Sequence, residues 1–150
     1  MIEVFVEGEP APQGSKNVYR TRSGRAVVVE ANPKLKKWRG RLKTVLRSCV
    51  HESFKPNEPV LLVAVFWLRR PKNHFRTGRF AGQLKKNAPK YASVKPDGDK
   101  YLRAVCDGLT DAGVVADDGQ IVVHHCEKRY CNPGEPQGVM IRAASLEVPF

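Results

Sequence analysis

The feature that most constrains the fold is an uninterrupted apolar run from Val60 to Leu68, rich in β-branched and aromatic residues. No polar residues alternate with the apolar ones, a pattern typical of a strand buried on both faces in the middle of a sheet. The run is far too short to cross a bilayer. The sequence therefore predicts a fold built around one central strand.

The other expected elements follow from hydrophobic periodicity and turn signals. They are a strand at 2–6, a basic hairpin at 15–29, a helix from Asn32-Pro33 to Val50, a helix begun by Asp99 and stopped by Gly113, a strand at 120–130 and a strand at 139–148. A turn at 134–138 predicts that the last two strands pair as a hairpin. The length suits one domain, 1–150, which we expect to be α+β, with a mixed sheet flanked by helices.

The net charge of +11 is large for this length and attracts polyanions such as nucleic acid. Residues 69–90, here called the arm, contain no acid and interleave basic residues with His74, Phe75 and Phe80, as expected of a segment lying on a nucleic-acid backbone or an unpaired base. A mobile basic loop is the alternative for the arm, and a solvated strand edge is the alternative for the hairpin. The candidate DNA-binding residues are Lys16, Arg20, Arg69, Arg70, Lys72, Arg76, Arg79, Lys85 and Lys86.

The first residues, Met1 to Phe5, lack the basic and then apolar pattern of a secretory leader, so we expect a cytoplasmic protein. Its four cysteines are then expected to be reduced thiols. A zinc site at His124, His125, Cys126 and Cys131 is disfavoured because consecutive strand residues point to opposite faces and no Cys-x2-Cys spacing is present.

Acidic residues gather in one window of this basic chain. Six of the 15 acidic residues lie within 95–120, including the pairs Asp97/Asp99 and Asp117/Asp118. Positions i and i+2 share a side only in extended backbone, so Asp97 and Asp99 should project together where the helix begins. The short link after the helix could return Asp118 to the same spot. Helix capping and turn formation are the alternative roles for these residues.

Three carboxylates at one place repel one another unless a cation lies between them. Oxygen ligands favour Mg²⁺, for which Mn²⁺ can substitute, over zinc or copper. Such an ion in a protein that attracts phosphate backbones indicates phosphodiester hydrolysis. Arg103, one helical turn after Asp99, could stabilise charge on the phosphate or pair with Asp99 or Asp107.

The motifs Lys95-Pro96-Asp97-Gly98-Asp99, Asp107-Gly108-Leu109 and Asp117-Asp118-Gly119-Gln120-Ile121-Val122 resemble those of the RusA-type Holliday junction resolvases of phages and prophages. The strong match covers about 30 residues of the 150. The arm looks longer than in the smallest members of that family.

This resemblance implies that Asp97, Asp99 and Asp118 are catalytic metal ligands. It also implies a homodimer, encoded by a phage or prophage, that nicks opposed strands of a four-way DNA junction and needs no small-molecule cofactor. Asp117 matches a second acidic position of the family.

The chain departs from the family pattern at two positions. Lys100 stands where the family has Asn, and Arg103 stands where it has a catalytic Lys. Arginine is effectively never deprotonated, so any proton transfer would fall to Lys100 or Lys95.

Two rival functions remain open at the level of sequence: a non-catalytic, architectural DNA-binding protein, and a less selective nuclease of branched DNA.

Overall fold

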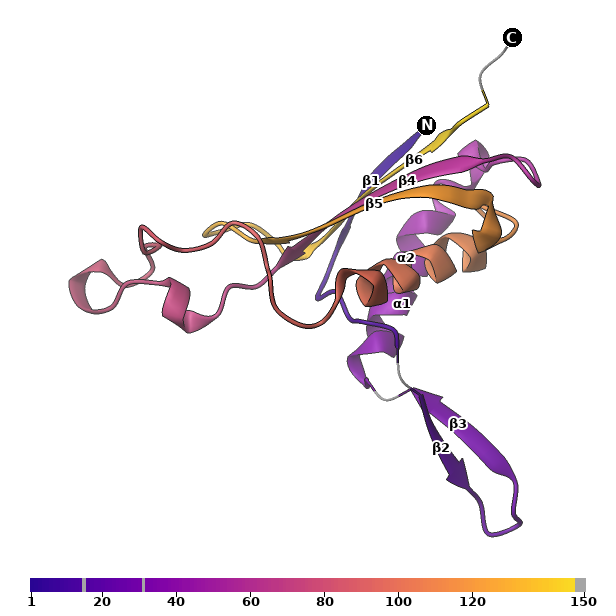
Figure 1. The fold of residues 1–150 in the computed structure, drawn as a ribbon, viewed down its shortest axis with the longest axis horizontal. Helices are drawn as coiled ribbons and strands as arrows, with labels where there is room; N and C mark the ends of the chain where they lie inside the picture. The colour runs from indigo at the N-terminus through magenta and orange to yellow at the C-terminus, as the bar shows by residue number, and fades with distance from the viewer. Residues whose placement is uncertain (15, 31, 148–150) are drawn as a thin grey trace.

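The central apolar run forms an inner strand of a four-stranded mixed sheet, in the order β1-β6-β4-β5 (Figure 1). The structure, a computed structural model, describes residues 1–14, 16–30 and 32–147, with only the backbone of 16, 17, 29 and 30. The strands are β1 (Ile2–Glu7), β2 (Lys16–Arg20), β3 (Ala26–Glu30), β4 (Val60–Leu68), β5 (Ile121–Tyr130) and β6 (Gly138–Ser145), and the α-helices are α1 (Lys34–Arg47) and α2 (Gly98–Asp111). A single α+β domain is confirmed.

β4 occupies the predicted central place, pairing parallel with β5 and antiparallel with β6. The expectation that it is buried on both faces was wrong, because its residues alternate between buried and half-buried. Both helices lie on the same side of the sheet (Figure 1). Leu62, Ala64 and Phe66 are therefore enclosed, whereas the intervening residues are only half-buried.

The predicted hairpin between the last two strands was also wrong. β6 lies between β1 and β4, and β5 pairs with β4 alone among the strands of this sheet. The end of β5 and the start of β6 flank the end of β4, where Leu68 pairs with Tyr130 and Trp67 pairs with Gly138. The turn thus passes over the end of β4. This order gives the most apolar strand two neighbours and leaves the more polar β5 at the edge.

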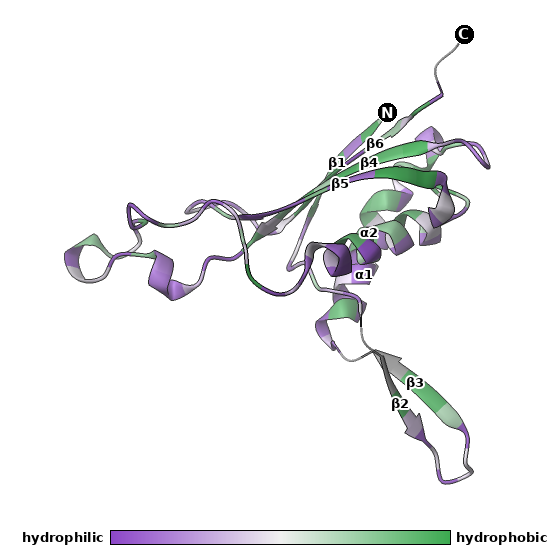
Figure 2. Cartoon of the chain, in the orientation of Figure 1, coloured by the Kyte–Doolittle hydropathy of each residue, from purple (hydrophilic) through white to green (hydrophobic). Residues whose placement is uncertain are grey.

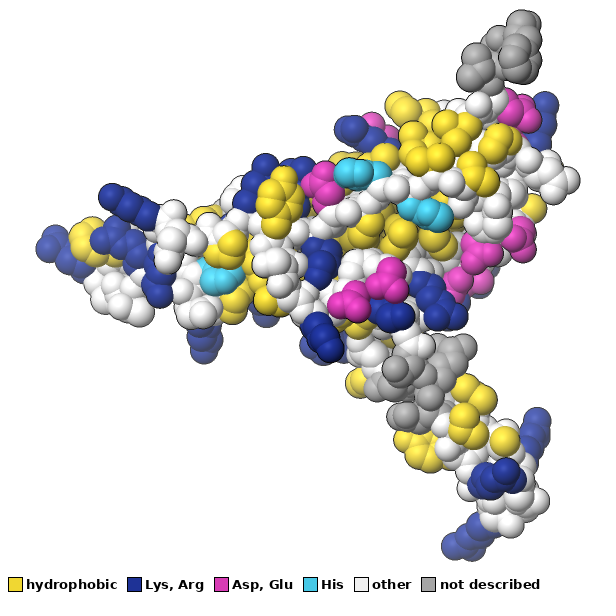
Figure 3. All heavy atoms as spheres, in the orientation of Figure 1, with side chains coloured by type: hydrophobic (Ala, Val, Ile, Leu, Met, Phe, Trp, Pro, Cys, Tyr) yellow, Lys and Arg dark blue, Asp and Glu magenta, His cyan; other side chains and the backbone are white. Residues whose placement is uncertain are grey.

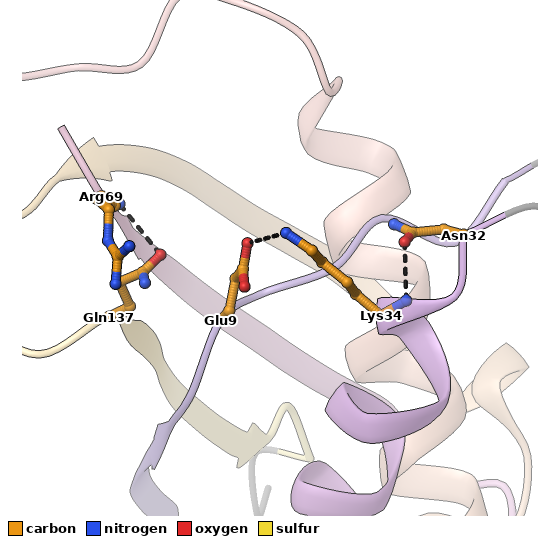
Figure 4. Close-up of polar contacts among 5 residues, drawn as sticks. All are labelled: Glu9, Asn32, Lys34, Arg69 and Gln137. Atoms are coloured by element: carbon orange, nitrogen blue, oxygen red, sulfur yellow. Dashed lines mark hydrogen bonds and ion pairs between the residues drawn. The ribbon is translucent and has the colours of Figure 1, made fainter. Parts of the chain in front are cut away.

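α1 begins where the Asn-Pro signal predicts. The Asn32 Oδ1 atom accepts a hydrogen bond from the Lys34 backbone N at 3.0 Å (Figure 4). The Lys34 side chain in turn reaches Glu9, with 2.8 Å between Nζ and Oε1. The apolar stripe of the helix is buried, with Leu35, Trp38, Leu42 and Leu46 facing inward.

α2 packs against α1 on one side and against β5 of the sheet on another. Its inner face buries Tyr101, Ala104, Val105 and Leu109, and the Tyr101 ring lies 5.3 Å from the Phe66 ring of β4, centroid to centroid. The backbone φ of Gly113 is +80°, the left-handed conformation that favours glycine just after a helix end. The core therefore lies between the two helices and one face of the sheet.

Two protrusions leave this body. The β2–β3 hairpin projects in one direction and the arm in another (Figure 1). The arm is mostly hydrophilic, unlike the strands of the sheet (Figure 2). Among the described residues, no helix combines the length and apolar character needed to span a membrane.

Two helical glycines make a matched test of the packing between α1 and α2. A Cβ at Gly40 would meet no atom within 4 Å, whereas a Cβ at Gly108 would lie 3.3 Å from Leu42 Cβ. We expect Gly40→Ala to raise the free energy of unfolding by up to about 1 kcal/mol through helix propensity. Gly108→Val should lower it by about 1–3 kcal/mol through overpacking. Urea denaturation measures both values, and equal effects would contradict this packing.

Candidate active site

Asp97 and Asp99 both lie at the start of α2, where the sequence predicts that a helix begins. Asp97 is the residue before the first helical turn, yet its side chain makes no capping hydrogen bond. Asp99 is in the first turn, its side chain is 70% exposed, and Oδ2 lies 3.3 Å from Lys100 Nζ. The capping explanation therefore does not account for the Asp97 carboxylate, and both acids face solvent.

The loop that carries Asp97 is held in place by β5. Lys128 Nζ donates to the backbone oxygens of Val94, at 2.5 Å, and Pro96, at 2.7 Å. The Cys126 thiol lies 3.6 Å from the backbone oxygen of Gly98. Sequence reasoning missed Lys128 because its partners are more than 30 positions away and are backbone atoms, which leave no mark in the sequence.

A second anchor comes from the loop after β1. Gln13 is 4% exposed; its amide nitrogen donates to the Asp107 carboxylate, and its backbone N donates to the Lys100 oxygen at 3.0 Å. Gly14 lies against the aliphatic part of the Lys100 side chain. Gln13 was also missed, because its partner Asp107 lies 94 positions away in the sequence. Asp107 therefore helps to hold this loop on α2.

The second acidic pair has two different roles. Asp117 caps the short 3-10 helix at Asp118–Gln120: its Oδ1 accepts from Gly119 N at 2.7 Å, and Gln120 completes a capping box. Asp118 is exposed and makes no such contact among the described residues. Asp117 is thus structural in this chain, whereas the Asp118 carboxylate is available.

The structure does not bring Asp118 to Asp97 and Asp99 within one chain. In residues 1–14, 16–30 and 32–147, no group of three His, Cys, Asp or Glu side chains is placed to hold a metal ion. The reason is the path of the chain along α2: Asp97 precedes the first turn of this 14-residue helix, whereas the segment that carries Asp118 packs against its later half. Asp118 instead lies near Cys106, whose thiol pKa is raised to about 12 by burial, with further contributions from Asp118 and Asp107.

Positive charge surrounds the first pair. Arg103 is exposed on α2, and no ion pair between described residues joins it to Asp99 or Asp107, which contact Lys100 and Gln13 instead. Lys95 is exposed just before Asp97. The guanidinium of Arg103 is therefore available to an anionic ligand.

The zinc alternative gains no support from the strand that carries its residues. His125 Nε2 lies 2.8 Å from Glu127 Oε1, and Cys131 Sγ lies 3.5 Å from the Pro136 backbone oxygen. All four cysteines are free thiols. Burial raises the pKa of the Cys126 and Cys131 thiols, which keeps them neutral near pH 7.

Basic side chains gather on the arm and toward the end of the hairpin (Figure 3). The exposed candidates are Arg20, Arg69, Lys72, Arg76, Arg79, Lys85 and Lys86, while the side chain of Lys16 lies outside the described residues. The backbone N of Arg69 donates to Gln137 Oε1 at 3.2 Å at the root of the arm (Figure 4).

Arg70 has a different place from the one the sequence indicates. It is 8% exposed, and its guanidinium donates to the backbone oxygens of Cys131 at 2.7 Å and Pro89 at 2.6 Å. It joins the two ends of the arm to the body. Because its donors are engaged and shielded, Arg70 leaves the set of DNA-binding candidates.

An exposed carboxylate pair thus lies at the start of a helix that also carries Arg103, for which no ion pair is found among the described residues, in a chain with two basic protrusions. Residues 7–142 match the sequence model of the family described as Endodeoxyribonuclease RusA, and the chain belongs to this family. Members of this family are DNA endonucleases, and the activity associated with the family is the resolution of Holliday junctions. Comparison with curated proteins gives no match.

Proposed function

We propose that this protein is a magnesium-dependent, structure-selective endonuclease that resolves four-way DNA junctions by paired symmetric nicks. The observation that carries the proposal is the pair of solvent-facing carboxylates at the start of α2, on a chain of net charge +11. The family resemblance further implies a bacterial cytoplasm as the site of action and a phage or prophage as the source.

The donor set fits a hard divalent ion. Magnesium in nucleic-acid enzymes is commonly held by one or two carboxylates together with substrate phosphates and water. Asp97 and Asp99 supply the carboxylates, and Asp118 is the third proposed ligand. When bound, such an ion polarises the phosphate and lowers the pKa of a bound water. Mn²⁺ has the same preference for oxygen ligands.

The cations of the site act on the phosphate by charge. Arg103 lies one turn after Asp99 on the exposed side of α2, where its guanidinium can bind a phosphate oxygen and stabilise the charge that develops there. Because arginine stays protonated, it does not transfer protons. Lys100, already 3.3 Å from Asp99, and the exposed Lys95 are the residues left for that role.

The protein acts as a homodimer in this proposal, and the dimer completes the metal site. One chain holds Asp97 and Asp99 at the start of α2 and Asp118 beside its later half, near Cys106. β5, beside α2, is an edge strand on which Val122 and Val123 are 56% and 45% exposed. A two-fold axis perpendicular to this edge would run a second copy of α2 antiparallel to the first. That arrangement brings Asp118 of each copy toward Asp97 and Asp99 of the other.

A labelled four-way junction tests the reaction. We expect magnesium to produce paired nicks, and Asp97→Asn, Asp99→Asn or Asp118→Asn to slow nicking by about 100-fold or more, a typical loss when one electrostatic group of an active site is removed. Junction binding in gel shifts should persist, because removing a carboxylate reduces repulsion from phosphate.

Asp111→Asn is the matched control, since Asp111 lies at the far end of α2 and pairs with Arg39 at 2.9 Å. It should cleave normally. Intact junction binding without magnesium-dependent cleavage would contradict the proposed enzymatic activity. Equal cleavage of forks, duplexes and junctions would indicate a less selective nuclease and not a junction resolvase.

Mixed dimers test the shared site. A chain carrying Asp97→Asn and Asp99→Asn and a chain carrying Asp118→Asn should each be inactive alone. Co-expressed with two different affinity tags and purified as heterodimers, they would form one complete site per dimer, giving single nicks in each junction. If each site is instead built within one chain, every site in the heterodimer carries a defect, and the mixture stays as inactive as its parents.

A further inference from the structure

The arm is a built protrusion with its own hydrogen bonds. Arg76 N donates to the Gln83 oxygen at 2.8 Å, and Lys85 N donates to the His74 oxygen at 3.0 Å. Phe75 and Leu84 form an antiparallel bridge between the two sides. With Arg70 joining its ends to the body, the arm holds its far end in a defined shape.

Phe80 is the most exposed aromatic residue of the arm. His74 packs edge-on against Tyr130, with 4.8 Å between ring centroids, and burial together with nearby Arg70 and Lys85 lowers its pKa. Phe75 is half-buried at the bridge. Phe80, by contrast, is 40% exposed in the short 3-10 helix Gly78–Phe80 at the far end of the arm.

Two arginines flank this exposed ring. The Arg76 guanidinium carbon lies 3.8 Å from the centroid of Phe80, and that of Arg79 lies 5.5 Å from it. The two arginines alone would be enough to bind a phosphate, and an exposed aromatic ring would add little to that binding. The combination of one ring and two cations instead suits a nucleotide, whose base stacks on the ring while its phosphates pair with the guanidinium groups.

We infer that the arm tip, formed by Arg76, Arg79 and Phe80, binds an unstacked base at the branch point and thereby selects branched DNA over duplex. Inside a duplex, both faces of each base are covered by neighbours. At a branch point, stacking is interrupted and a base face is open to an aromatic side chain. This inference rests on the proposed function, because it assigns to the arm the recognition of the branched substrate.

The test compares Phe80→Ala, Phe80→Leu and Phe80→Trp without divalent metal, so that only binding is measured. The probes are a four-way junction with 2-aminopurine at the crossover and a duplex of the same sequence. We expect Phe80→Ala and Phe80→Leu to weaken junction binding by roughly 5- to 150-fold, which corresponds to the stacking of one base. Duplex binding should change little, and Phe80→Trp should retain the junction affinity and the fluorescence change of the wild type.

Tyr19→Ala is the control, because Tyr19 is an aromatic residue of similar exposure on the other protrusion. It should keep the junction preference. Phe80→Leu binding the junction as tightly as wild type would overturn the inference, and so would equal losses on junction and duplex. These outcomes can be distinguished from failure of the proposed function. If the wild-type protein selects junctions through Phe80 but never cleaves them, the inference about the arm holds and the proposed nuclease activity is wrong.

Discussion

The packing of α2 against the sheet is the constraint on which the site depends. The Tyr101 ring lies against Phe66, Gly108 lets Leu42 approach closely, and Lys128 ties the preceding loop to β5. These contacts leave α2 little freedom to tilt or slide. They fix Asp97 and Asp99 at the start of the helix, whereas Asp118 lies beside its later half. The separation of the acids is therefore a property of the core, and it is the reason that the proposed metal site needs a second copy of the chain.

Charge divides the molecule into a body and two protrusions. Lysines and arginines gather on the arm and hairpin (Figure 3), and others, including Lys37 and Arg41 of α1, are exposed on the body together with the acids at the start of α2. Long-range attraction brings a polyanion to such a surface, and its strength falls with salt. The carboxylates would repel the same polyanion unless a cation neutralised them. The arm and the hairpin would thus attract DNA to the protein. A metal bound at the acidic site would then allow a phosphate to approach the carboxylates.

The sequence predicts best where the signal is local. The helix signals at Asn32-Pro33 and Gly113 depend on neighbouring residues, and the structure agrees. The sequence fails where distant parts compete. The predicted pairing of the last two strands was wrong because β4, the most apolar strand, lies between β5 and β6. Arg70, Gln13 and Lys128 could not be recognised because their partners are backbone atoms or residues far away in sequence. The length of α2 agrees with the predicted helix from Asp99 to Gly113, but the sequence does not reveal the path of the link that carries Asp118.

The central claim is that carboxylates divided along α2 hold the catalytic metal jointly between two copies. Electron paramagnetic resonance of Mn²⁺ measures bound metal directly, without DNA or turnover. The account predicts tight Mn²⁺ binding to the wild-type dimer, loss of it in both the Asp97→Asn/Asp99→Asn and the Asp118→Asn proteins, and half the wild-type stoichiometry in their heterodimer. Full Mn²⁺ binding by the Asp118→Asn protein would contradict the shared site. So would the absence of Mn²⁺ binding by the heterodimer when the wild-type protein binds the ion.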